Sequence, residues 1–497
     1  MIKKISYKLE KQHVFVFFIL LLTFLMRFPS LFEPFWYGDE GIFAAVARNL
    51  NQGGVLYQTA WDNKPPMIYL TYASIFSVFG VSMFWLRLVA AIAVLATSAL
   101  IYEMALLGLG KRRALVATFI FGLLTSLRLI EGNLALTEIF MILPITLAMY
   151  IAIKRKFDFR SLFFAGLLFA VASLYKQVGA FEAAALGVFI FLQSKKFLEF
   201  FKKGFILSLG FMVPYLVTLL YFASKGLVSE YIFGAYTYYK IYLNESPQYA
   251  MLITVSKYLP LLSVIFYGIY KKFKKEKVEM LHLFFLWAGC SFLGSYFSGR
   301  TYGHYLVQVT PALSLLLASV KFSKFYITPA RVVFVLAFFL PILFLTRLLF
   351  SDFLSGGPIN QINYWGNFTS YVAGGKSVDA YNDYFDGNVN TIMALADSLK
   401  MKGGYGKSVY IWGDIPWLYA IDNLKNPSRY VTSFHVFGVP GGPAEVEKSL
   451  NAEPPLYIIK PESSNGYFAG LENILLKKYT LVEKLNSAEV FVLRSAK

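Results

Sequence analysis

The chain has 497 residues, of which 57% are hydrophobic and 15% are charged. This excludes a soluble globular domain, which needs less apolar surface, and indicates a polytopic membrane protein. The formal net charge of +18 would suggest a nucleic-acid partner in a soluble protein. Here the basic residues stand in short clusters between apolar runs, which is the pattern that sets membrane topology, so we expect no nucleic acid as partner.

About eleven apolar runs are candidates for membrane-spanning helices. They lie near residues 13–31, 82–107, 113–130, 134–153, 161–175, 178–194, 204–224, 251–270, 280–298, 303–320 and 331–350. The first run ends without a small-residue cleavage site, so we expect it to remain as a membrane helix.

The basic clusters predict the orientation of these helices. Residues 67–80 are apolar but follow two prolines and end at a glycine, so we expect a helix in the outer interface that does not cross. The Lys and Arg clusters then fall on one side, which the positive-inside rule places in the cytoplasm. We therefore expect a multi-pass plasma-membrane protein with a cytoplasmic N-terminus and an extracytoplasmic C-terminus.

The composition changes after residue 350, where Gly-rich turns separate segments of alternating helical and strand periods. Strands are expected at 407–414, 428–434 and 455–462, with helices between them and a final helix followed by two strands. This alternation predicts a small extracytoplasmic α/β domain with a mainly parallel sheet over 352–497. Residues 1–351 form the predicted transmembrane domain.

The first outer loop, residues 32–81, holds an adjacent pair of acids, Asp39 and Glu40. Carboxylates at a membrane face are costly unless they are solvated or paired, so they are functional candidates by default. We interpret Asp39 as a general base with Glu40 beside it. The alternative is that the acids only cap the following helix, GIFAAVARNL, or offset its dipole.

A second group in this loop is Asp62-Asn63-Lys64-Pro65-Pro66. The two prolines stiffen the backbone that aims the Lys64 ammonium. We interpret Lys64 as a clamp for a lipid phosphate, with Asp62 positioning it. The alternative is an interfacial anchor with a local Asp–Lys pair.

Polar residues at the outer ends of other predicted spans are candidates for one cavity below the outer surface. They are Glu131, Asn133, Glu138, Lys176, Gln177, Arg300, Tyr302, His304 and Tyr305. Arg300 has the fork geometry that binds phosphate, but a snorkelling interface arginine explains it equally well. A lone histidine in an apolar bundle is more often hydrogen-bonded packing than a catalyst, and this alternative applies to His304.

Motifs for nucleotide, zinc and serine-hydrolase chemistry are absent from the sequence. The DYFDGNVN segment offers Asp383, Asp386, Asn388 and Asn390 at a spacing that suits a hard cation, but turn and helix-cap chemistry explains it better. We expect no required cofactor and assign no metal ligands, and a divalent cation beside a phosphate is left open.

The first outer loop resembles a known family. The matching motifs are Gly38-Asp39-Glu40, Asp62-Asn63-Lys64-Pro65-Pro66 and the following YLTYASIFSVFG and RLVAAI. The family is the dolichyl-phosphate-mannose–protein mannosyltransferases (glycosyltransferase family 39) with their bacterial aminoarabinose-transferase-like relatives, which have the GT-C fold. The resemblance points to a bacterial or archaeal member. It is best over about residues 30–180 and weak beyond residue 352.

The resemblance implies roles for individual residues. Asp39 matches the first-loop catalytic acid, with Glu40 its neighbour, and Lys64 matches a lysine that contacts the lipid phosphate. Lys176, in LYKQVG, is similar to a Thr-Lys-Gly segment but departs from it on both sides. Glu138 stands where many relatives have an aspartate at the start of a span.

His304-Tyr305 is similar to a His-Tyr pair of some bacterial members. With these residues as support, the resemblance implies an inverting glycosyltransferase of the EC 2.4 class. It would move a sugar from a polyprenyl-phosphate-linked donor to an acceptor hydroxyl or phosphate at the outer face. Lys64, Arg300 and Lys176 would bind the donor's lipid phosphate. The sugar, and whether the acceptor is a protein, a lipid or a glycan, are left open.

Other functions are compatible with parts of the sequence. A transporter or flippase of lipid-linked sugars would show inverted repeats and broken helices near the bilayer centre, whereas the polar residues here gather at one face. A polysaccharide polymerase or ligase would have arginines dominating its outer loops. A non-catalytic assembly protein would have no need of the Asp39 and Lys64 motifs.

Overall fold

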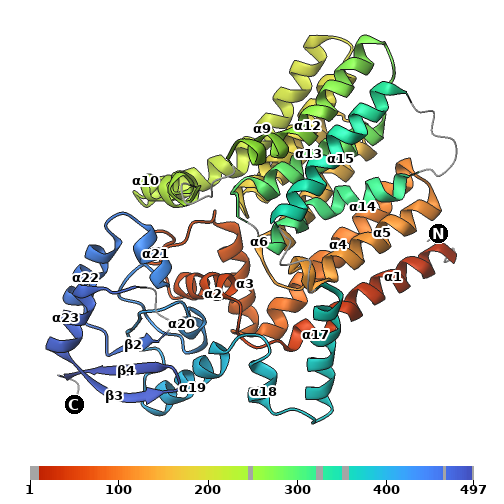
Figure 1. Cartoon of the computed structure of the whole chain (residues 1–497). Helices are drawn as coiled ribbons and strands as arrows, with labels where there is room; N and C mark the ends of the chain where they lie inside the picture. The colour runs from red at the N-terminus through yellow and green to blue at the C-terminus, as the bar shows by residue number, and fades with distance from the viewer. Residues whose placement is uncertain are drawn as a thin grey trace, which may run out of the picture. The chain divides into compact units, whose positions relative to one another are not determined.

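The computed structural model describes residues 11–243, 250–300, 302–320, 328–349, 357–462 and 466–494. The chain folds into two compact units (Figure 1). Unit 1 comprises Met1–Ser30, Arg87–Thr218 and Ser246–Ile362, and unit 2 comprises Leu31–Leu86, Leu219–Glu245 and Asn363–Lys497. The predicted outer loop 32–81 therefore folds with the C-terminal segments in unit 2, so the units divide the chain at other places than the predicted boundary at residue 351.

Unit 1 is a bundle of helices. These are α1 (Lys11–Arg27), α4 (Met83–Gly108, whose first turn belongs to unit 2), α5 (Lys111–Ser126), α6 (Thr137–Lys154), α7 (Phe159–Ser173), α8 (Phe181–Gln193), α9 (Phe197–Ser224, whose last turns belong to unit 2), α12 (Ala250–Phe273), α13 (Met280–Tyr296), α14 (Thr310–Ser319) and α15 (Pro329–Leu349). Each predicted span contains one of these helices. Helix α6 packs against α7, and α12 packs against both α13 and α15 (Figure 1).

Six helices among the described residues are long and apolar enough to cross a membrane. They begin at Gln12, Met83, Thr137, Phe197, Leu252 and Pro329. Many apolar side chains on α9 and α15 are exposed, as expected of helices whose solvent is lipid. The prediction of a polytopic helical membrane protein is confirmed.

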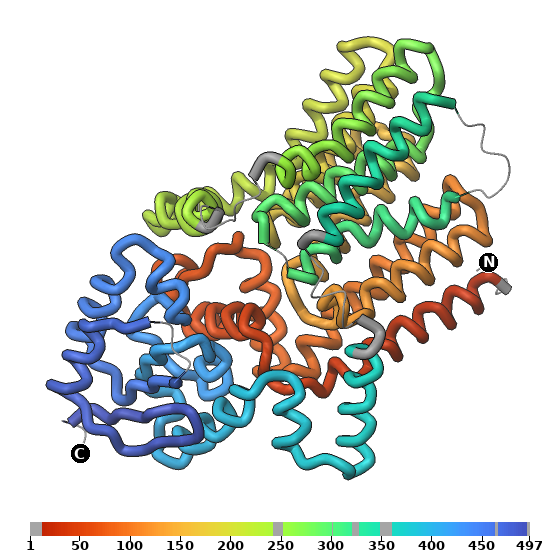
Figure 2. Tube along the Cα trace, viewed as in Figure 1, coloured from red at the N-terminus to blue at the C-terminus, as the bar shows by residue number. Residues whose placement is uncertain are grey.

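Unit 2 contains the remaining elements. Its helices are α2 (Gly38–Asn51), α3 (Met67–Phe79), α10 (Val228–Ile232), α11 (Tyr239–Leu243), α18 (Val378–Asn382), α19 (Asn388–Met401), α20 (Trp417–Ile421), α21 (Ser433–Gly438), α22 (Gly442–Ala452) and α23 (Ala469–Lys478), and α17 (Gly357–Val372) enters it from unit 1. Figure 2 shows early segments of this unit, in red and orange, beside C-terminal segments in blue. Helix α2 packs against both α3 and α20.

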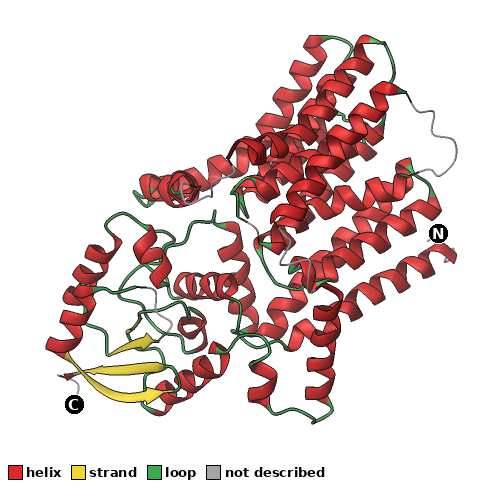
Figure 3. Ribbon diagram, in the orientation of Figure 1, coloured by secondary structure: helices red, strands yellow, loops and turns green. Residues whose placement is uncertain are grey.

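The sheet of unit 2 has the strand order β1-β2-β4-β3 (Figure 3). Strand β1 (Val409–Ile411) pairs in parallel with β2 (Tyr457–Pro461), whereas β4 (Ala488–Leu493) is antiparallel to both β2 and β3 (Tyr479–Leu485). The prediction of a mainly parallel sheet is therefore wrong. Strands β1 and β2, which helices connect, pair in parallel, whereas the short turn between β3 and β4 forces those two strands to run in opposite directions.

The predicted strand at 428–434 is also wrong, because α21 begins at Ser433. Thr432 caps this helix by accepting a hydrogen bond from the backbone N of His435. The Asp414 carboxylate accepts hydrogen bonds from Ser433 Oγ at 3.0 Å and from the backbone N of Phe434 at 3.1 Å. These side-chain acceptors at a helix N-terminus outweigh the strand preference of the apolar residues before it.

Candidate active site

Asp39 and Glu40 lie in the first turn of α2. The residue that precedes the helix is Tyr37, and no side chain caps this end, so neither acid is an N-cap. Glu40 is fully buried, whereas Asp39 is half-buried. Of the two acids, Asp39 therefore has the access that a proton acceptor needs.

Helix α20 holds this turn of α2 in place. Trp417 Nε1 donates a hydrogen bond to the Tyr37 carbonyl at 3.0 Å. A Cβ atom at Gly41 would lie only 2.8 Å from Cδ1 of the Trp417 ring, so the close packing of α2 on α20 requires glycine at this position. The position of the Asp39 carboxylate thus depends on a C-terminal helix of the same unit.

Asp62 is buried, with 2% of its surface exposed, and its carboxylate is surrounded by hydrogen-bond donors. The Tyr69 hydroxyl donates to Oδ2 at 2.6 Å, and the backbone N of Asn63 donates to Oδ1 at 2.7 Å. Burial raises the pKa of Asp62, but the charge of Lys64 and the hydrogen bonds from Tyr69 and the Asn63 backbone outweigh it and hold that pKa below its usual value. Asp62 is thus ionised at neutral pH.

Lys64 is half-buried, and its backbone is held by two tyrosines. The Tyr57 hydroxyl donates to the Lys64 carbonyl at 2.7 Å, and the Lys64 N–H donates to the Tyr69 hydroxyl at 3.3 Å. Lys64 Nζ donates to Asn63 Oδ1 at 2.6 Å. The ammonium is therefore fixed on a rigid turn, as an anion clamp requires, although an interfacial anchor would show the same contacts.

His435, which the sequence analysis did not single out, lies beside these residues. Its Nε2 is 3.3 Å from Asp62 Oδ1, and its ring meets the Trp61 ring edge to face at 5.1 Å. The charges of Asp62, Lys64, Asp414 and Asp39 all act on the His435 pKa. Unit 2 therefore gathers Asp39, Asp62 and Lys64 around one buried imidazole. No motif around residue 435 reveals this, because the pairing spans more than 370 residues of chain.

A second polar cluster lies in unit 1, within the bundle. Lys176 Nζ is 2.5 Å from Glu138 Oε1, and both side chains are almost fully buried. Thr137 Oγ1 donates to the other carboxylate oxygen of Glu138 at 2.7 Å, and the Lys176 ammonium lies 3.5 Å from the centre of the Tyr305 ring. The structure thus pairs Glu138 with Lys176, whereas the sequence motifs predicted each residue individually and gave no contact between them.

His304 belongs to the same cluster through Tyr305, whose ring it meets at 4.8 Å. Its Nδ1 lies 2.6 Å from Glu131 Oε2, and its backbone N–H donates to the same oxygen. Two buried arginines hold the loop that carries Glu131: Arg27 donates to the Gly132 carbonyl and Arg87 donates to the Asn133 carbonyl. This agrees with hydrogen-bonded packing for His304 and does not test a catalytic role.

Arg300 follows α13 and Gly299, whose φ of +74° turns the chain, and its side chain is half-buried. Its role in phosphate binding stays a prediction. In the DYFDGNVN segment, Asp386 Oδ1 accepts from the backbone N of Asn388, and Asp383 Oδ1 accepts from Asn390 Nδ2. Within the described ranges, no group of three or more His, Cys, Asp or Glu residues is arranged to hold a metal ion.

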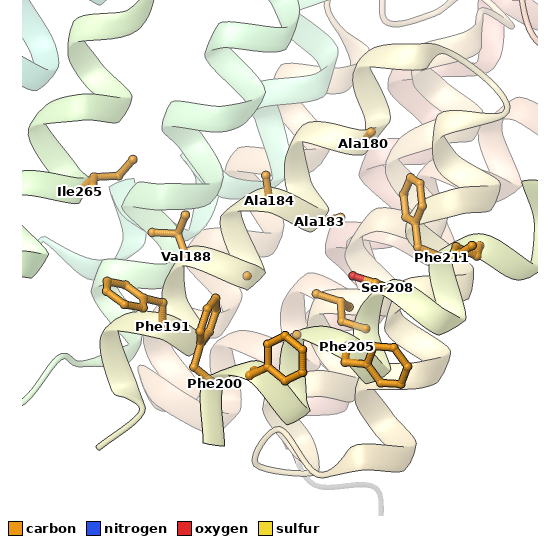
Figure 4. Close-up of a pocket in the computed structure, with 15 residues that line it drawn as sticks. Ala180, Ala183, Ala184, Val188, Phe191, Phe200, Phe205, Ser208, Phe211 and Ile265 are labelled. Carbon is orange, nitrogen blue, oxygen red and sulfur yellow. The ribbon is translucent and has the colours of Figure 1, made fainter. Parts of the chain in front are cut away.

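Unit 1 also contains an apolar cavity of about 760 Å³ between α8 and α9 (Figure 4). Small residues of α8, among them Ala184 and Gly187, line one side, and phenylalanines of α8 and α9 line the rest. Ala180, the lining residue that comes earliest in the chain, is four positions after Lys176. The lining is almost entirely hydrocarbon, which suits a lipid chain.

Comparison with known proteins agrees with this architecture. Residues 63–222 match the family model described as dolichyl-phosphate-mannose-protein mannosyltransferase. The fold is similar to that of ArnT from Cupriavidus metallidurans, both bound to undecaprenyl phosphate (TM-score 0.60) and in the apo state (TM-score 0.59). Sequence identity is 16% in both cases, and the first match covers 96% of this chain and 97% of ArnT, the second 97% and 98%.

An uncharacterized protein of Aquifex aeolicus (strain VF5) is 23% identical over 324 residues. The match covers 60% of this chain and only 62% of that relative's length. The fold and the membrane helices define a membrane protein of the GT-C class. Residues 63–222 are thus similar to the protein mannosyltransferases, and the fold of the chain is similar to that of ArnT, in agreement with the resemblance seen in the sequence.

Proposed function

We propose that this glycosyltransferase transfers a sugar from a polyprenyl-phosphate-linked donor to an acceptor hydroxyl or phosphate at the outer membrane face, and that it inverts the anomeric centre. The observation that carries the proposal is the grouping of Asp39, Asp62 and Lys64 in unit 2. A half-buried carboxylate and a rigidly held ammonium are the two charges that such a transfer needs. The binding of undecaprenyl phosphate by ArnT supports the choice of donor.

The proposed reaction with a hydroxyl acceptor is a single displacement. The acceptor oxygen attacks the anomeric carbon while Asp39 takes the hydroxyl proton. The bond between that carbon and the phosphate oxygen breaks, and polyprenyl phosphate leaves with the bonding electrons. Lys64 offsets the negative charge that develops on the leaving phosphate. The products are the glycoside and polyprenyl phosphate, and the step needs no oxidant or nucleotide.

The other candidate residues have supporting roles in this proposal. Asp62 positions the Lys64 turn, and Glu40 shapes the first turn of α2 from its buried position. Lys176 and Arg300 belong to unit 1, and their part in binding the lipid phosphate stays a prediction. Glu138 holds Lys176, and Tyr305 covers its ammonium.

The apolar cavity between α8 and α9 is the proposed seat of the donor's prenyl chain (Figure 4). Packing of the prenyl chain against the apolar lining of the cavity buries no polar group and therefore carries no cost of polar desolvation. Small lining residues such as Gly187 leave room for the methyl branches of the chain.

The test uses the purified full chain with a panel of polyprenyl-phosphate sugars and measures released polyprenyl phosphate. We expect release with at least one donor and a loss of about 10²-fold or more in Asp39→Asn, because general-base catalysis contributes roughly that factor. Lys64→Ala should raise the donor KM about tenfold or more, since a hydrogen bond to a charged group is worth about 1.5–3 kcal/mol.

Asp379→Asn is the matched control for Asp39→Asn. Asp379 is exposed and occupies the same second position of a helix, α18, in the same unit, so its substitution changes only the helix-dipole interaction. It should leave release unchanged. Near-normal turnover by Asp39→Asn, with folding intact, would show that Asp39 is not the base, and unchanged donor dependence in Lys64→Ala would reduce Lys64 to an anchor.

A further inference from the structure

A C-terminal strap, residues 428–435, lies along the turn that carries Lys64, within unit 2. The Trp61 backbone N–H donates to the Arg429 carbonyl at 2.8 Å. Arg429 Nη1 donates to the Tyr57 carbonyl at 3.2 Å, and the Trp61 and Tyr430 rings are in contact. The strap therefore holds the turn along its length, and His435 stands at its end.

The polar contact of the His435 side chain is with Asp62. Only 2% of His435 is exposed, and its Nδ1 has no hydrogen-bond partner among the described residues. His435 Nε2 is the ring nitrogen that faces Asp62 Oδ1, 3.3 Å away, and because a carboxylate attracts an N–H and repels a lone pair, a neutral His435 is favoured with its hydrogen on Nε2. Burial lowers the pKa of His435 against the opposing charge of Asp62, which favours this neutral form.

The contact continues from Asp62 to Lys64 in two short steps. Asp62 Oδ1 lies 3.3 Å from His435 Nε2 and accepts a hydrogen bond from the Asn63 backbone N–H at 2.7 Å. Asn63 Oδ1 in turn accepts from Lys64 Nζ at 2.6 Å. A shift of the carboxylate would therefore move the asparagine, and with it the ammonium.

We propose that His435 is a positioning residue of the transfer site: by its polar contact with the Asp62 carboxylate it fixes the turn that presents Lys64, and so sets the affinity for the donor's lipid phosphate. This rests on the proposed function in that Lys64 is taken as the phosphate clamp. It assigns to the C-terminal strap a direct part in donor binding, beyond packing.

Two variants at this position separate hydrogen bonding from packing. His435→Phe keeps a flat ring against Trp61 but removes the donor, whereas His435→Gln retains an N–H donor. We expect His435→Phe to weaken binding of polyprenyl phosphate, measured by titration in detergent, by up to about tenfold, because the polar contact with the Asp62 carboxylate is lost, and a hydrogen bond to a charged group sets the upper limit of its contribution. The same variant should raise the donor KM with little change in kcat, and His435→Gln should restore both to within a few-fold of the wild type.

Thr432→Ala is the control for a purely structural effect. It removes the cap of α21 beside His435 but leaves the imidazole and Asp62 unchanged. It should lower the melting temperature without changing the affinity for polyprenyl phosphate. If His435→Phe does not fold, His435→Leu takes its place.

The inference is overturned if the variant without a donor binds polyprenyl phosphate as the wild type does, or if His435→Gln fails to restore binding. Because binding is measured without turnover, this result is independent of whether sugar transfer is observed. A wild-type chain that binds polyprenyl phosphate but releases none from any sugar donor would refute the proposed function. The role of His435 would still be decided by the binding measurements on its variants.

Discussion

The buried Glu138–Lys176 pair predicts a specific pattern of stability in unit 1. Lys176→Met removes the ammonium and leaves a carboxylate that is 1% exposed without its charge partner. Removing one member of a buried ion pair costs about 3–5 kcal/mol. Glu138→Gln should cost less than Lys176→Met, because the lone ammonium keeps its contact with the face of the Tyr305 ring.

The double variant completes a thermodynamic cycle. Glu138→Gln with Lys176→Met leaves no buried charge at the pair, so we expect its stability to lie within about 1–2 kcal/mol of the wild type. The summed cost of the two single variants should therefore exceed the cost of the double variant by at least about 1–3 kcal/mol, which is the coupling between the two residues. Thermal unfolding of the purified chain in detergent, followed by tryptophan fluorescence, measures all four proteins under the same conditions.

The same cycle decides whether Lys176 also binds donor. If the ammonium contacts the lipid phosphate, the double variant regains stability but keeps a raised donor KM. If Lys176 only neutralises Glu138, stability and KM recover together. Additive losses in the two single variants, with no coupling, would refute the buried pair itself.

Two further predictions address the cavity and the C-terminal domain. Gly187→Leu should raise the KM for long-chain polyprenyl donors but not for a donor with a truncated chain. A Cβ atom at this position meets no atom within 4 Å, so the leucine side chain would extend into the cavity and fill it. Equal KM changes for both donors would contradict binding of the prenyl chain there. Asp422→Asn should raise the melting temperature at pH 7 and remove a loss of stability as pH rises from about 4 to 6. Burial raises the pKa of Asp422 from 3.8 in the unfolded chain to about 6 in the folded chain, so the folded state binds the proton more tightly. The free energy of unfolding therefore falls as Asp422 loses its proton between these two pH values. An unchanged pH profile in Asp422→Asn would refute this.

Part of this site was predictable from local sequence. Asp39 and Lys64 stand within motifs that are short in sequence, and their types alone suggest a base and an anion clamp. His435 was not predictable, because its role arises from a contact with Asp62 made by folding of distant segments. The pairing of Lys176 with Glu138 was missed for the same reason.

The sequence by itself determined the class of protein and the positions of its membrane helices. Long apolar runs must form helices in lipid, since only internal hydrogen bonding satisfies the backbone there. Local periodicity likewise located β1, β2, α19 and α22.

Only the tertiary structure decided how these elements combine. It placed the outer loop in one unit with the C-terminal segments, made the sheet mostly antiparallel, and turned the expected strand at 428–434 into a strap that ends in α21. Each of these outcomes depends on which other segment packs against the one in question. Strand pairing, helix capping and the burial of charge are set by that neighbouring segment and not by the segment's own composition.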